Sequence, residues 1–174
     1  MTKNYRYQYY VEGQCEQKLI SILKEQKTWI ISGKIEVFNV VQEIFTNTRL
    51  RQLGANTIVI LVFDTDVSNT DNLRKNISIL KKESNVKAVW CVLQVNNLED
   101  ELCRSTNIRE IKELIDCKSQ KEFKHAFVTE KRLFEKLLKH EFDFDKIWVM
   151  QPPNGYDGIH NDGERVKKKR VTNQ

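Results

Sequence analysis

Carboxylates are the side chains of this sequence whose types and spacing most clearly suggest chemistry. They fall into three groups, and each group follows a stretch of apolar residues. The first group is Glu12 and Glu16, the second is Asp64 and Asp66, and the third is Glu99, Asp100 and Glu101. Carboxylates placed together repel one another, and a divalent cation removes that penalty. Because hard oxygen ligands suit Mg²⁺ or Mn²⁺, the acids predict a site for one of these ions.

The spacing within the first two groups supports a shared site. Asp64 and Asp66 are two residues apart at the end of an extended stretch, so their side chains should point the same way. Glu12 and Glu16 are four residues apart around Gly13, which permits a tight turn from a strand into a helix. Taken singly, each acid also has a structural interpretation, because polar residues close strands and favour helix N-termini. The joint pattern favours a functional site.

Strand-like and helix-like stretches alternate along the chain around these acids. The predicted strands are 5–11, 30–38, 57–63, 86–95 and 146–150, and the predicted helices are 16–27, 40–53 and 72–83, followed by three or four short helices in 98–140. This alternation predicts an α/β fold, in which a mainly parallel sheet lies between helices. In such a sheet, sites collect at the carboxyl ends of the strands, where all three acidic groups are expected.

The length of 174 residues fits one domain. We expect an α/β core at residues 1–105, a helical C-terminal extension at 106–150 packed on that core, and a basic, flexible tail at 151–174 beyond Pro152 and Pro153. No apolar run approaches the roughly 20 residues that a membrane-spanning helix requires, and the N-terminus lacks the order of a signal peptide. The four cysteines form no CxxC pair. These features predict a cytoplasmic protein with reduced thiols and no membrane partner.

Two segments that carry the acids resemble motifs of the Toprim family. YYVEGQCEQKLI at residues 9–20 is similar to the first Toprim motif, and ILVFDTDVSN at residues 60–69 is similar to its Asp-x-Asp motif. The four-residue gap from Glu12 to Glu16 is closer to the OLD-type and RloB-like Toprim proteins of bacterial defence systems than to topoisomerases or primases. The resemblance covers residues 5–103. It implies a compact sheet of mostly parallel strands and Mg²⁺-dependent cleavage of phosphodiester bonds, which makes the expected protein a nuclease.

The resemblance also implies roles for individual residues. The implied ligands are Glu12, Asp64 and Asp66 for one metal ion, and Glu16 with one acid of Glu99, Asp100 and Glu101 for a second. Two such ions would activate a water molecule and stabilise the leaving oxygen. OLD-type nucleases also use a lysine downstream of the acids, for which Lys118 and Lys124 are the candidates.

The sequence departs from OLD proteins in one respect. Those proteins carry an ATPase domain, whereas this sequence has no GxxxxGK[ST] loop. We therefore expect the chain to act alone, to act with a separate ATPase or effector subunit, or to have lost activity; self-association into a homo-oligomer is a further expectation.

Basic residues near the C-terminus predict contact with nucleic acid. Residues 164–174 hold five basic side chains and one acidic one, so they contribute +4 of the net charge of +5. The basic residues are Arg165, Lys167, Lys168, Lys169 and Arg170. On a flexible segment they would contact phosphates without sequence preference.

Two other functions remain open at this point. A phosphatase of the haloacid-dehalogenase type also has Asp-x-Asp after an apolar strand, as nucleophile and acid/base, although there the motif follows the first strand and here it follows the third. The second alternative is a catalytically inactive Toprim module that binds nucleic acid or a partner protein through the C-terminal helices and the basic residues.

Overall fold

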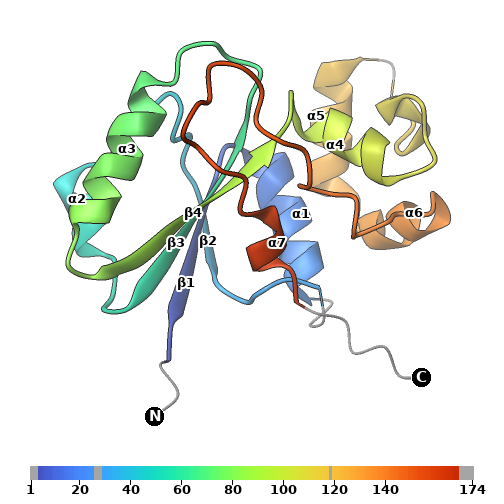
Figure 1. Cartoon of the computed structure of the whole chain (residues 1–174). Coiled ribbons are helices and arrows are strands. Elements are labelled where there is room, and N and C mark those ends of the chain that lie inside the picture. The colour runs from blue at the N-terminus through green and yellow to red at the C-terminus, as the bar shows by residue number, and fades with distance from the viewer. Residues whose placement is uncertain (1–3, 26–28, 118, 169–174) are drawn as a thin grey trace.

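The computed structural model describes residues 4–25, 29–117 and 119–168 of the chain. Its centre is a four-stranded sheet, all parallel, with the order β2-β1-β3-β4 (Figure 1). The strands are β1 (Arg6–Val11), β2 (Lys34–Val37), β3 (Thr57–Asp64) and β4 (Val86–Gln94). The apolar run of β3 is buried along almost its whole length because helices cover both faces of the sheet. The predicted α/β fold with a parallel sheet between helices is confirmed.

Helices form two layers around this sheet, and a separate apolar core lies on each face (Figure 1). The helices are α1 (Gln14–Glu25), α2 (Asn47–Arg51), α3 (Asp71–Lys82), α4 (Leu98–Ser105), the 3₁₀ helix η1 (Ile111–Glu113), α5 (Gln120–Thr129), α6 (Leu133–Lys139) and α7 (Gly163–Val166). Leu73 and Leu80 of α3 belong to one core, and Leu19 and Leu23 of α1 belong to the other. The second core also contains Phe123 and Phe127 of α5, so the helical extension packs against α1.

The predicted helix at 40–53 is wrong for most of its length, because only α2 forms. The side chain of Asn76, fully buried on α3, accepts a hydrogen bond from Phe45 N–H at 2.9 Å. Its amide group donates to the carbonyls of Val40 and Glu43 at 2.8 and 2.7 Å. These bonds satisfy backbone groups that a helix would have paired internally, and they hold the segment as a loop. Thr46 then caps α2 by accepting from Arg49 N–H.

Two predicted strands also differ from the structure. The second strand is limited to β2, and Ile30 instead forms an isolated antiparallel bridge with Lys167. Residues 146–150 form turns and no strand. Trp148 there is buried and has a positive φ of 58°, a left-handed conformation that no strand residue adopts. The C-terminal end of the predicted helix 16–27 lies outside the described residues, within which α1 ends at Glu25.

The chain does not leave the domain at Pro152 and Pro153. Residues 151–168 cross the molecule instead, and Tyr156 and Val166 are buried in the two cores. Ile31 N–H donates to Val166 O at 2.8 Å. The expected flexible tail is therefore wrong up to Lys168, because apolar side chains and backbone hydrogen bonds fix the segment. No helix in the described part of the chain has the length and apolar character needed to cross a membrane.

Candidate functional site

Glu12 and Asp64 meet at the carboxyl edge of the sheet. β1 and β3 are neighbours with Val11 opposite Val62, so the residues that follow these strands lie side by side. Glu12 Oε2 accepts a hydrogen bond from Asp64 N–H at 3.0 Å. Glu12 Oε1 accepts another from Asn39 Nδ2 at 3.0 Å. Asn39 follows β2, so the ends of three adjacent strands fix the Glu12 carboxylate.

Glu16 approaches the same place from the first turn of α1. Its side chain is buried, and a Cβ atom on Gly13 would lie 3.0 Å from Glu16 Oε2, so the turn is tight around this carboxylate. Burial raises the pKa of Glu16, and the nearby charges of Glu12 and Glu99 raise it further. Backbone N–H groups of Glu16 and Gly13 oppose this shift by donating to the carboxylate.

Asp64 is the most perturbed acid of the group. Its Oδ1 is buried and has no hydrogen-bond partner among the described residues. Burial is the largest cause that raises the pKa of Asp64 to about 9, and the charges of Glu12 and Glu16 come next. Asp66 and Glu99 push it in the same direction. Asp64 therefore holds a proton at neutral pH in the absence of a cation.

A cavity of about 390 Å³ opens beside Asp64. Helices α1, α4 and α5 and the end of β3 supply its walls, which are Gly13, Gln14, Cys15, Glu16, Asp64, Glu99, Lys124, His125 and Val128. Lys124 lowers the pKa of Glu12 through its positive charge, although burial makes the net shift upward. The Cys15 thiol donates to Lys124 O at 3.7 Å. Burial, followed by the charges of Glu16 and Glu99, raises the pKa of Cys15 to about 12, so this thiol is no nucleophile at neutral pH.

Asp66 lies at the exposed side of the group, where it raises the pKa values of Glu12 and Asp64. Tyr156 approaches from the C-terminal segment: its ring stacks on Phe63, and its hydroxyl donates to Val67 O at 3.0 Å. Burial and the acids raise the pKa of Tyr156 to about 12. Sequence reasoning missed Tyr156 because it lies in the segment assigned to the tail, and no motif marks it.

Glu101, one of the three acids after β4, is held in structural contacts away from the cavity beside Asp64. Glu101 is fully buried and pairs with Arg104 at 2.8 Å. Its carboxylate also accepts from the N–H groups of Val95 and Trp148. The candidate role of Glu101 as a metal ligand is therefore wrong, because both of its carboxylate oxygens already accept hydrogen bonds within the fold. Asp100 accepts from Asn96 Nδ2 at 2.8 Å, and Lys118 lies outside the described residues.

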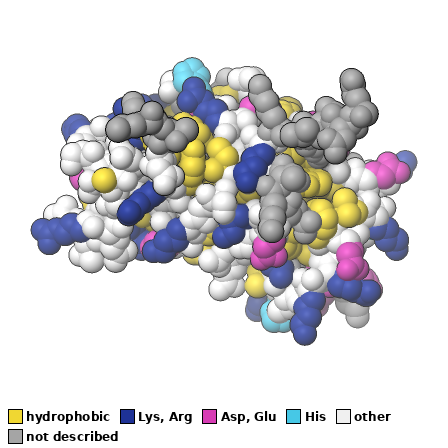
Figure 2. Space-filling model, turned by 90° about the horizontal axis from the view of Figure 1, so that it is seen from below, with side chains coloured by type: hydrophobic (Ala, Val, Ile, Leu, Met, Phe, Trp, Pro, Cys, Tyr) yellow, Lys and Arg dark blue, Asp and Glu magenta, His cyan; other side chains and the backbone are white. Residues whose placement is uncertain are grey.

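The basic residues near the C-terminus are held in ion pairs and backbone contacts. Arg165 pairs with Asp162 at 3.0 Å, and Lys167 pairs with Glu164 at 2.6 Å. Lys168 N–H donates to Trp29 O, while Lys169 and Arg170 lie outside the described residues. Seen from the end of the molecule where β1 begins, Lys and Arg side chains are scattered between apolar ones (Figure 2).

The acids suit a hard cation by their donor chemistry. All of them offer carboxylate oxygens, and Asp64 Oδ1 has no competing partner in the described structure. The described residues contain no preformed group of three or more His, Cys, Asp or Glu side chains arranged around a metal position. Binding would therefore require the acidic side chains to move toward one another, as removal of their mutual repulsion by a cation would allow.

Comparison with known proteins yields no relative for this chain. It matches no protein-family model, and it has no significant match among curated proteins or solved structures. The Toprim resemblance therefore rests on the two motifs around Glu12 and Asp64.

Proposed function

We propose that this protein is a nuclease of the Toprim type that cleaves phosphodiester bonds with Mg²⁺ or Mn²⁺. The observation that carries the proposal is the buried Oδ1 of Asp64, which lies among Glu12, Glu16, Asp66 and Glu99 and has no hydrogen-bond partner among the described residues. A buried carboxylate oxygen without a partner is costly, and acids that repel one another add to that cost. A bound cation would satisfy this oxygen and offset the repulsion.

The proposed ligands divide into two sets, with Glu12, Asp64 and Asp66 for one ion and Glu16 with Glu99 for a second. Bound ions would neutralise the phosphate and supply an activated water molecule. Asn39 keeps Glu12 oriented through its hydrogen bond to Oε1. Lys124, in the wall of the cavity, provides a positive charge for a phosphate oxygen of the substrate. Asp64 must release its proton before it can act as a ligand.

Nucleic acid is the proposed substrate, and the cytoplasm is the proposed compartment. Because the sequence has no P-loop, we propose that any ATPase or effector that it requires is a separate subunit, as in a bacterial defence system. Lys169 and Arg170 would add affinity for the phosphate backbone.

Isothermal titration with Mn²⁺, together with cleavage assays on plasmid DNA and single-stranded RNA, tests this proposal. Asp64→Asn should lose both Mn²⁺ binding and cleavage, because the amide cannot replace the anionic ligand. Asp116→Asn is the matched control, because Asp116 is exposed and lies outside the cavity. Cleavage that persists in EDTA or in Asp64→Asn contradicts the nuclease. Mn²⁺ binding without cleavage of either substrate would favour the inactive binding module.

A further inference from the structure

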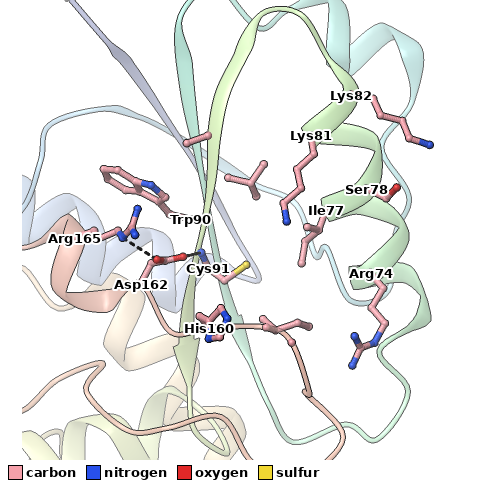
Figure 3. A pocket seen from close by; sticks show the side chains of 14 residues that line it. Arg74, Ile77, Ser78, Lys81, Lys82, Trp90, Cys91, His160, Asp162 and Arg165 are labelled. Carbon is pink, nitrogen blue, oxygen red and sulfur yellow. Dashed lines mark hydrogen bonds and ion pairs between the residues drawn. The ribbon is translucent and has the colours of Figure 1, made fainter.

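A second and larger cavity lies at the outer edge of β4, away from the acids. Its volume is about 680 Å³, and it lies between α3 and the segment 158–165 (Figure 3). None of the acids Glu12, Glu16, Asp64, Asp66 and Glu99 contributes to its walls. The size is typical of pockets that hold small molecules.

Cationic side chains dominate the polar lining of this cavity. Its charged residues are Arg74, Lys81, Lys82, Arg165 and one acid, Asp162. The carboxylate of Asp162 is already committed, because it pairs with Arg165 at 3.0 Å and accepts from Cys91 N–H at 3.0 Å (Figure 3). The lining therefore has more positive charge than its own acid can balance.

The cations on α3 that line this cavity have no acidic partner in the part of the chain that the structure describes. Arg74 donates to the carbonyls of Gly155 and Asp157 and to Thr70 Oγ1, all of them uncharged acceptors. Within the described residues, no carboxylate lies within ion-pair distance of Lys81 or Lys82. Lys81 extends between α3 and the sheet, whereas Lys82 points outward (Figure 3). Lys81 and Arg74 thus supply an uncompensated positive charge on one wall.

The sheet supplies a backbone donor to the same cavity. Cys91 N–H and C=O bond with Asp162 on the outer side of β4. Because backbone groups point alternately to the two sides of a strand, the N–H and C=O of Val89 also point outward. Val89, Ile77 and Ile159 form an apolar surface next to these polar groups. The cavity therefore combines cations, an apolar wall and the N–H group of Val89, for which the described residues supply no acceptor.

We propose that this cavity binds a phosphorylated small molecule of nucleotide size. The phosphates are held by Lys81, Arg74 and the N–H of Val89, since charge-assisted hydrogen bonds to phosphate are the strong ones. The planar, less polar part of the ligand packs on Ile77, Val89 and Ile159. The site needs neither a metal ion nor the acids at the carboxyl edge, so it is independent of the proposed nuclease activity.

ATP titrated by calorimetry in EDTA is the test, because EDTA removes any metal-mediated binding at the acids. Lys81→Glu should weaken ATP binding by about tenfold or more, as expected when one charged hydrogen bond to phosphate becomes a repulsion. Lys75→Glu is the matched control: Lys75 is an exposed lysine on the same helix that does not line the cavity, and its change should alter the Kd less than about twofold. Equal weakening by both variants, or no ATP binding at millimolar concentration, would overturn the site.

Three further titrations separate the parts of the proposal. Adenosine should bind far more weakly than ATP because it lacks phosphate. Tripolyphosphate should bind more weakly than ATP because it lacks the ring, and equal affinity would overturn the role of the apolar wall. Asp64→Asn should bind ATP with the same Kd as the unchanged protein, because Asp64 does not line this cavity. ATP binding is therefore expected even if the proposed nuclease activity is refuted. Loss of ATP binding in Asp64→Asn would overturn the assignment of the site to β4.

Discussion

Asp64→Asn should make the metal-free protein more stable at neutral pH, although it removes a proposed metal ligand. Oδ1 of Asp64 is buried and has no partner among the described residues, and burial, followed by the charges of neighbouring acids, raises the pKa of Asp64 to about 9. Asparagine has nearly the same shape and no charge. It also brings an amide donor next to carboxylates, which can accept a hydrogen bond from it.

The size of this effect depends on pH. Below the ordinary pKa of 3.8, Asp64 is protonated in both the folded and the unfolded state, so its titration does not change the free energy of unfolding there. Between that value and about 9, the unfolded chain releases the proton while the folded chain keeps it, so the stability of the folded state falls as pH rises. The fall is about 1.4 kcal/mol per pH unit, which amounts to roughly 4 kcal/mol between about pH 5 and about pH 8.

Urea denaturation in EDTA, at these two pH values, measures the free energy of unfolding of both proteins. The free energy of unfolding of Asp64→Asn minus that of the unchanged protein should increase by roughly 4 kcal/mol from the lower to the higher pH. Asp116→Asn should show no such growth, because Asp116 is exposed. If the unchanged protein and Asp64→Asn lose stability in parallel as the pH rises, the argument from burial and repulsion is refuted.

Two other substitutions test the structural roles of buried polar side chains. Glu101→Ala should lower the free energy of unfolding by about 3 kcal/mol, because the N–H groups of Val95 and Trp148 lose their acceptor and Arg104 loses its ion-pair partner. A loss below about 1 kcal/mol in urea denaturation would contradict that role. Asn76→Ala should cost about 3 kcal/mol, because three backbone groups of the loop after β2 lose their partner. Ser78→Ala, exposed on the same helix, is the control in thermal unfolding, and an equal Tm for the two variants would refute the assignment.

The sequence predicted the sheet and the meeting of acids because both follow from local rules. An unbroken apolar run such as β3 has to be covered on both faces, and parallel strands bring their carboxyl ends to one edge. These rules place Glu12 beside Asp64, as the hydrogen bond between them shows. The same rule, applied to the second predicted strand, would have placed Asn39 at this edge, where it bonds to Glu12. The site ligands and the metal itself stay predictions.

Other features depended on contacts that spacing does not encode. Successive helical residues are rotated by about 100°, so Glu99 and Glu101 point in very different directions, and only one of them can face the cavity. Which one does so is decided by Arg104 and by Trp148 N–H, a group 47 residues downstream of Glu101. The helix predicted at 40–53 failed for a similar reason, since Asn76 supplies hydrogen bonds from another element.

The contact between Asp162 and Cys91 has a consequence for how the chain folds. β4 is an edge strand, and the outer backbone groups of Cys91 and Leu93 gain their partners only when Asn161 and Asp162 reach them. Since synthesis proceeds from the N-terminus, the sheet can assemble on the ribosome well before this last segment emerges. During that interval the edge of β4 is open to pairing with a strand of another chain. Misassembly of this protein should therefore concentrate at β4, and should increase when translation is interrupted before Asp162.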